Sequence, residues 1–250
     1  MPIHDWTRVD AGIFHDLHLS WVSELSKALN SGLLPRDFYA LSEELGGRIA
    51  PGERSTDPPN WMLGGVSADL PNMRTIHDDP PLTRFHTQAE AFAYARRRRT
   101  LVVRHADDHR ATALVEMLAP GEKASRWWMR RFLDRAVSAL VHGMHVLVID
   151  LHLPGPHDPN GIHAALWSEL TDELVSSSSS QPLTVAAYAA GSVVCAYVEP
   201  TAVGEPLSDM PLFLEPDVYV NVPLESTYTA AYAGVPRFYR DILEGPTAAS

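Results

Sequence analysis

The chain has 250 residues, 45% of them hydrophobic, and a formal net charge of -11, which is the composition of a globular protein with a substantial core. The absence of any run of about 18 apolar residues argues against a membrane-spanning helix, and the acidic excess argues against an indiscriminate nucleic-acid binder. The opening MPIHDWTRVD lacks the features of a signal peptide, and the single cysteine, Cys195, permits no internal disulfide. We therefore expect a cytoplasmic protein, with Cys195 as a core residue in the apolar run VVCAYV.

The N-terminal part is predicted to form an ordered arm followed by an amphipathic helix. Ile3 and Trp6 are costly to leave in water, so the arm should pack against the core. Asp10 is a suitable N-cap for a helix over residues 11–31. The apolar residues of this helix recur at helical spacing: Phe14, Leu17, Trp21, Leu25, Ala28 and Leu29.

The strongest secondary-structure signals lie in the middle of the chain. The segment DFYALSEEL, residues 37–45, is predicted to form a strand or a short helix, and it is followed by a long irregular stretch. Residues 100–118 form two apolar runs around a polar turn, which predicts an antiparallel hairpin. Residues 123–142 have the pattern of an amphipathic helix, and residues 144–153 that of a strand covered on both faces.

The C-terminal part is less regular. Residues 161–174 are predicted to be helical, residues 193–203 to form a strand, and residues 224–244 to form short helices broken at Gly234–Pro236. Because nothing marks a second core, we expect one α/β domain over residues 1–250. Its core would span about residues 10–155, with an extension over about residues 156–250.

Glu116 is the residue with the clearest chemical requirement. It stands in the otherwise apolar run ALVEML, where an unpaired carboxylate would cost several kcal/mol to desolvate. Lys123, seven residues later, is the nearest candidate partner along the chain. A metal ion, an arginine or backbone donors are the alternatives.

Basic residues concentrate around this stretch. Residues 96–135 hold eleven Lys and Arg but five Asp and Glu. Such a local patch either attracts a phosphate-bearing partner such as nucleic acid, through residues such as Arg126 and Arg130, or forms a solvated helix face with internal ion pairs.

A rival group of candidates ends the predicted strand over residues 144–153. Asp150 and His152 lie where α/β sheets commonly bind ligands, and with His15, His18, His142 or His145 they could form a zinc or general-base site. The chain contains no HExxH, GxSxG, P-loop or GxGxxG motif.

Four segments carry a resemblance to a known family: MPIHDWTRVDAGIFHDLH, ALVEMLAPGEKAS, PGPHDPNGIHAALW and MPLFLEPDVYVNVPLE. They resemble a bacterial family of conserved proteins of unknown function. The family's central motif, an acid followed by Ser-Pro-x-Asn-Lys, is similar to that of Uma-type endonucleases in the PD-(D/E)xK, or restriction-endonuclease-like, group. The resemblance implies an α-β-β-β-α-β core with a mixed sheet. It also implies Mg²⁺ or Mn²⁺ held by Glu116 and an upstream aspartate, with Lys123 as the catalytic cation.

The chain departs from this pattern at several positions. Asp57, in ERSTDPPNWML, stands where the family has Pro-Asp-Val, although spacing alone does not choose between Asp57, Asp69 and Asp78 as the second carboxylate. The family's Ser and Asn are Ala119 and Glu122. An E-x-K motif would place lysine at position 118, which is Leu118. Two main hypotheses follow: a divalent-metal-dependent phosphodiesterase or nuclease-like protein, or a catalytically inactive binding or scaffold module on the same fold. A His/Asp metal hydrolase at Asp150 and His152 is a third.

Overall fold

The computed structural model of the protein describes residues 1–44, 99–172 and 180–245. The helices are α1 (Ala11–Ala28), α2 (Pro120–Lys123), α3 (Arg126–Val141), α4 (Gly161–Trp167), α5 (Leu224–Tyr232) and α6 (Arg237–Glu244). The strands are β1 (Phe38–Glu44), β2 (Arg99–His105), β3 (Ala111–Met117), β4 (His145–Asp150), β5 (Leu183–Ala189), β6 (Cys195–Thr201), β7 (Met210–Glu215) and β8 (Val218–Val222). A short 3-10 turn, Trp6–Arg8, precedes α1, and a π turn, Leu29–Leu33, follows it.

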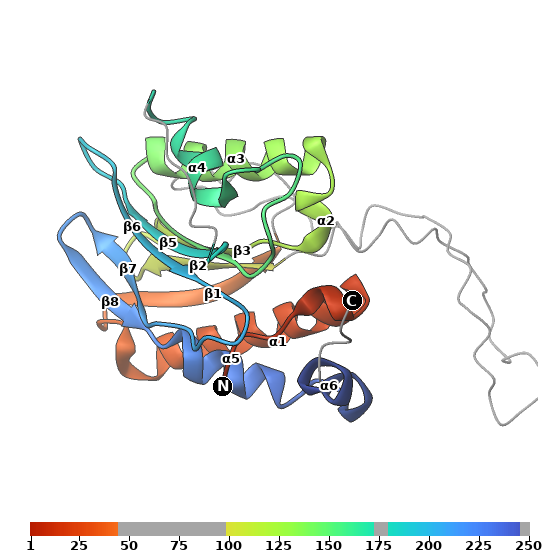
Figure 1. Cartoon of the computed structure of the whole chain (residues 1–250). Helices are drawn as coiled ribbons and strands as arrows, with labels where there is room; N and C mark the ends of the chain where they lie inside the picture. The colour runs from red at the N-terminus through yellow and green to blue at the C-terminus, as the bar shows by residue number, and fades with distance from the viewer. Residues whose placement is uncertain (45–98, 173–179, 246–250) are drawn as a thin grey trace, which may run out of the picture.

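Six strands form one mixed sheet in the order β1-β2-β3-β4-β5-β6 (Figure 1). β3 and β4 are parallel, with Glu116 opposite Val148, and the other neighbouring strands are antiparallel. The parallel pair requires a crossover connection, which α2 and α3 supply. β7 and β8 form a separate antiparallel hairpin.

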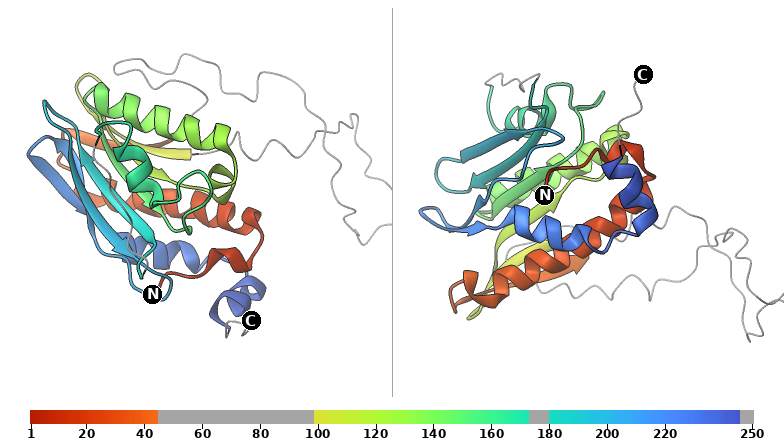
Figure 2. Two further views of the ribbon diagram at one scale, coloured as in Figure 1. Left: turned by 45° about the horizontal axis from the view of Figure 1, so that its top comes forward. Right: turned by 60° about the horizontal axis from the view of Figure 1, so that its bottom comes forward.

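Helices cover both faces of the sheet. α3 and α4 lie on one face, and α1 and α5 lie on the other (Figure 1). α5 runs alongside α1, as the second view of Figure 2 shows. β7 packs against β3, β4 and β5 on the same face as α1.

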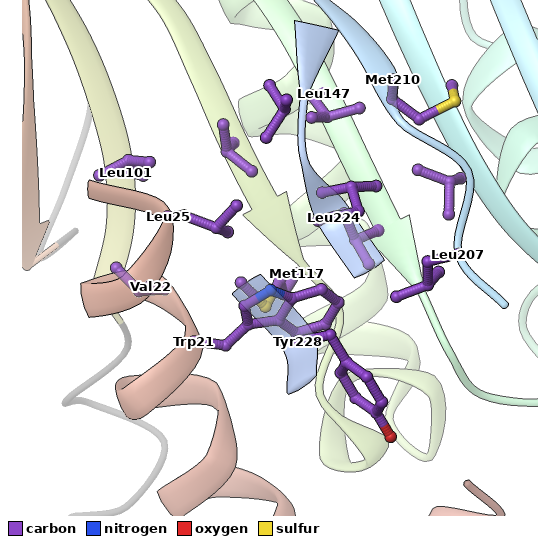
Figure 3. Packing of buried hydrophobic residues seen from close by; sticks show 14 of the residues in the cluster. Trp21, Val22, Leu25, Leu101, Met117, Leu147, Leu207, Met210, Leu224 and Tyr228 are labelled. Carbon is purple, nitrogen blue, oxygen red and sulfur yellow. The ribbon is translucent and has the colours of Figure 1, made fainter. Parts of the chain in front are cut away.

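The core on the α1 face joins the two ends of the chain. Trp21 of α1 packs edge-on against Tyr228 of α5, with 5.1 Å between the ring centroids, and Leu25 of α1 belongs to the same cluster (Figure 3). Trp21 is fully buried, and its indole Nε1 donates a hydrogen bond to Thr227 Oγ1 at 3.0 Å. The same cluster runs from Ile3 to Leu243, so the C-terminal extension shares its core with the N-terminal helix.

Local sequence explains the boundaries of α1. The Asp10 side chain accepts a hydrogen bond from the Gly12 N–H at 2.7 Å, which confirms the predicted N-cap. The helical segment ends at Gly32, whose φ of 117° is not helical. Glycine suits this position because a residue with a Cβ would be strained in that conformation. The predicted burial of Ile3 and Trp6 is also confirmed.

Several other predictions need correction. The helix predicted over residues 123–142 is α3, which begins only at Arg126, and Lys123 belongs to the preceding short helix α2. β5 was not predicted, and the helix over residues 161–174 ends at Trp167. Cys195 is exposed, because β6 is the last strand of the sheet, and its prediction as a core residue is wrong.

Among the described residues, no helix is both long enough and apolar enough to cross a membrane.

Candidate functional site

The sheet places two acidic candidates on its α3 face. Residues alternate between the two faces along a strand, and Leu114 and Val148 belong to the core beneath α3. Glu116 in β3 and Asp150 in β4 therefore point to this same side, near the C-terminal ends of the parallel pair. Asp57, the predicted second metal ligand, lies outside the described residues.

Glu116 pairs with an arginine of α3. Its side chain is 1% exposed. Arg135 Nε donates to Oε1 at 2.9 Å, and Arg135 Nη2 donates to Oε2 at 3.0 Å. Thr100, on the adjacent strand β2, donates its hydroxyl to Oε1 at 3.2 Å. This two-point contact between guanidinium and carboxylate is the strongest form of side-chain ion pair, and it meets the desolvation requirement recognised in the sequence.

Lys123 belongs to a second cluster. Its Nζ donates to Asp150 Oδ2 at 2.5 Å and to the carbonyl oxygen of His152 at 2.9 Å. Asp158 Oδ2 lies 2.8 Å from the same nitrogen, as an ion pair without hydrogen-bond geometry. Lys123 therefore pairs with the Asp150–His152 group, the rival candidate site of the sequence analysis. It does not pair with Glu116.

Burial changes the acid–base properties of this second cluster. Desolvation raises the pKa of Asp150 to about 6, and Lys123 opposes that rise. Desolvation, with the Lys123 charge added, lowers the pKa of His152 to about 4. His152 Nε2 is buried without a hydrogen-bond partner in the described part of the chain, and its ring packs edge-on against Phe14, 4.4 Å between centroids. His152 is therefore neutral, and the Lys123 ammonium group is paired with both Asp150 and Asp158. The cluster is a buried group of polar side chains that already neutralise one another.

The short helix α2 links the two clusters. Glu122 and Lys123 are adjacent in α2 and both are buried. Glu122 Oε2 accepts a hydrogen bond from the Ala119 N–H at 3.0 Å, and Glu122 Oε1 lies 4.0 Å from Arg135 Nη2. Charged groups of alternating sign therefore extend from Glu116 through Arg135 and Glu122 to Lys123.

The predicted phosphate-binding arginines lie on the exposed side of α3. Arg126 is exposed. Arg130 is 54% exposed and contacts Asp134 at 2.7 Å and Glu169 at 2.8 Å, so two carboxylates already surround its charge. Nucleic acid as a partner of this face stays a prediction.

The histidines proposed for a zinc site are spread along the fold. His142 follows α3, and His145 begins β4, roughly 16 Å along the strand from Asp150 at its other end. His18 is buried, with Nε2 3.0 Å from the Arg99 carbonyl oxygen, and the centroids of His15 and His18 are 6.3 Å apart. Within the described ranges, no group of three His, Cys, Asp or Glu residues is arranged to hold a metal ion.

We expect His145 to make the protein sensitive to acid. Its Nδ1 accepts a hydrogen bond from the Ala190 N–H at 3.0 Å, which requires an unprotonated Nδ1. Burial lowers the pKa of His145 to about 4, against 6.5 for an ordinary histidine. The unfolded chain therefore binds a proton between pH 6.5 and 4 that the folded chain does not, and stability falls as pH falls through that window.

His145→Asn keeps an acceptor near the position of Nδ1 but cannot titrate. In wild type, His145 should account for about 2 kcal/mol of the stability lost between pH 7 and pH 5. The His145→Asn variant should lose about 2 kcal/mol less of its free energy of unfolding than wild type between pH 7 and pH 5, as measured by urea unfolding at the two pH values. An equal loss in the two proteins would show that His145 does not govern the acid response.

Sequence reasoning missed three members of these clusters. Arg135 was not singled out from the sequence, although it lies three residues after Phe132 and four before Ala139, both buried. That spacing was a usable signal. Thr100 and Asp158 carried none, because only the assembled sheet and the loop after β4 bring them to Glu116 and Lys123.

Comparison with protein-family models, curated proteins and solved structures gives no match. The resemblance to Uma-type endonucleases therefore stays a prediction from the sequence.

Proposed function

We propose that the protein is a non-catalytic binding or scaffold module on an endonuclease-like core. The observation that carries the proposal is the ion pair in which Arg135 binds both carboxylate oxygens of Glu116 at 2.9 and 3.0 Å. Two-metal or one-metal phosphodiester hydrolysis needs such oxygens as metal ligands. In this chain they are ligands of a guanidinium group, so the described residues do not fit the metal.

The order of elements supports the endonuclease-like part of the proposal. From α1 to β4 the main elements of the described chain are a helix, three strands, a helix and a strand, apart from short turns and α2. β1, β2 and β3 are antiparallel neighbours, and β4 is parallel to β3. The order of these described elements agrees with the α-β-β-β-α-β core that the resemblance implies, in which Glu116 would lie on the third strand.

The neighbours of Glu116 support the non-catalytic part. The side chain that β2 places against Glu116 is Thr100, a hydroxyl and not a second carboxylate. Leu118 occupies the lysine position of an E-x-K motif and is fully buried. Lys123, the alternative lysine, is held by Asp150 and Asp158. Among the described residues, Glu116 and Lys123 thus have structural partners, and the lysine of an E-x-K motif has an apolar replacement.

The alternative is a divalent-metal-dependent nuclease. The position of Glu116 on the third strand favours it, and Asp57 would supply the second ligand. This mechanism requires Arg135 to release Glu116 when the metal binds. A His/Asp hydrolase requires Asp150 to be accessible, yet Asp150 is 1% exposed and bonded through both oxygens, to Lys123 and to the His152 N–H.

Titration of Mn²⁺ distinguishes these functions. We expect wild-type protein to show no heat of binding beyond that of Glu116→Gln, and no rise in Tm with Mn²⁺, because a ligand that binds only the folded state must stabilise it. Glu169→Gln, which alters an exposed carboxylate, is the control for weak surface binding.

Mn²⁺ binding to wild type that disappears in Glu116→Gln but persists in Glu169→Gln would overturn the proposal and establish the metal site. The Tm measurement on wild type decides the question even if Glu116→Gln folds poorly.

A further inference from the structure

The two edge strands of the large sheet, β1 and β6, differ in whether a side chain binds their outward backbone groups. At one edge, the Asn30 side chain binds the middle of β1: Asn30 Nδ2 donates to the Ala40 carbonyl at 2.9 Å, and the Ala40 N–H donates to Asn30 Oδ1 at 2.9 Å. The side-chain amide occupies the place that a further strand would take. This edge is protected against strand addition.

At the other edge, β6 has no such protection. Within the described ranges, no side chain or backbone group outside β5 bonds to the backbone of Cys195–Thr201. Pro200 has no N–H, and a proline in an edge strand directs its nitrogen away from the sheet. Because alternate residues point their backbone groups to the same side, the N–H and C=O groups of Ala196 and Val198 form the outward edge.

The side chains of β6 also favour pairing. Edge strands that must stay unpaired carry lysines, prolines or inward-pointing charges. β6 (CAYVEPT) has no basic residue and one acid, Glu199, and its one proline, Pro200, stands near its C-terminal end, so it removes no outward N–H from Ala196 or Val198. Tyr197 is 49% exposed and Val198 36%. The exposed Tyr197 ring lies 5.1 Å from Phe213, a buried residue of β7 whose ring lies 5.4 Å from the exposed Tyr219 of β8, so Tyr197 is anchored on the β7–β8 hairpin.

We propose that β6 is a homodimerisation strand, which pairs antiparallel with β6 of a second copy about a twofold axis at Val198. In this register Val198 faces Val198 of the second copy, and the two residues exchange both backbone hydrogen bonds. Ala196 N–H faces the Pro200 carbonyl, and Tyr197 faces Glu199. No like charges meet within the strand pair, so β6 is its own complement.

This inference concerns assembly and goes beyond the proposed function. The occupant of the edge is an extended strand, because extended backbone groups are what it leaves to be bonded. A second copy is always available in solution and matches the edge in register and in charge. Pairing would join two six-stranded sheets into one continuous sheet.

Analytical ultracentrifugation and cysteine cross-linking test the proposal in the full-length chain. Wild type should sediment as a concentration-dependent dimer. Val198→Lys places two lysines opposite each other, so its dissociation constant should rise roughly tenfold or more.

Val198→Cys in a Cys195→Ala background should form a disulfide-linked dimer on mild oxidation. The matched control is Leu41→Cys in the same background, since Leu41 is 48% exposed on the protected edge strand β1. It should remain monomeric on the same gel. A monomeric wild type, a dimer indifferent to Val198→Lys, or equal cross-linking of the two cysteine variants would each overturn the proposal.

Discussion

Lys123→Met is expected to destabilise the folded protein by about 3–5 kcal/mol at neutral pH, the largest effect of any single substitution at the candidate site. Lys123 is 5% exposed, and its Nζ neutralises Asp150 and Asp158 at 2.5 and 2.8 Å. Removing the cation leaves two buried carboxylates without a counter-charge. Chemical denaturation followed by circular dichroism measures the loss.

The loss should depend on pH in a defined direction. Burial raises the pKa of Asp150 to about 6 from an ordinary value of 3.8, so protonation of Asp150 stabilises the folded state. That stabilisation is complete below pH 3.8 and is lost as pH rises through 6. A protonated Asp150 needs no cation. The cost of Lys123→Met should therefore be smaller at pH 5 than at pH 8 by at least about 1 kcal/mol.

Lys27 supplies the control, because the sequence contains two lysines and Lys27 is the exposed one. Its side chain is 68% exposed and pairs with Glu24 at 2.7 Å. Lys27→Met should cost less than about 1 kcal/mol. Equal costs for the two lysine variants would contradict the assignment of Lys123 to a buried ion cluster.

Arg135→Met is expected to cost about 3 kcal/mol, since it leaves Glu116 buried without its guanidinium partner. Glu116→Met should cost a similar amount. The double variant should recover most of the sum, because two apolar side chains can replace a buried ion pair at little net cost. A double-mutant cycle from urea unfolding gives the coupling energy, expected at about 3 kcal/mol or more.

Arg130→Met tests whether the effect is specific to the buried arginine. Arg130 stands on the same helix but is 54% exposed, against 20% for Arg135. Its removal should cost under about 1 kcal/mol despite two carboxylate partners. If Arg135→Met proves no more costly than Arg130→Met, Glu116 must draw its stability from another partner, and the metal-site hypothesis regains support.

The sequence predicted the centre of the fold because there the local pattern and the tertiary environment agree. β2, β3 and β4 each contain a continuous apolar run (LVV, ALV and VLVI), and α3 has a clear buried stripe. β5 (LTVAAYA) follows a serine tract and a proline, and its small residues gave no strong strand signal. The prolines in and beside β7 and β8 likewise hid a hairpin, whose prolines lie at Pro211, in the turn at Pro216, and just after β8 at Pro223.

The site was harder to predict than the fold. That Glu116 needs a partner follows from its apolar neighbours, but which partner it has depends on how far α3 is rotated over the sheet. Proximity along the chain favoured Lys123, yet the turn after β3 carries this residue across to the end of β4. There it meets Asp158, forty-two residues after Glu116 in sequence. Such contacts between elements leave no trace in local spacing.

The amide of Asn30 has a consequence for the size of any assembly that the sheet can build. A sheet with two bare edges can add copies at both sides, and such head-to-tail addition propagates into fibres. Here the β1 edge is closed by a side chain that each copy carries with it. If β6 pairs as proposed, the joined sheet would have only the closed β1 edges at its two ends, and growth would stop at two copies.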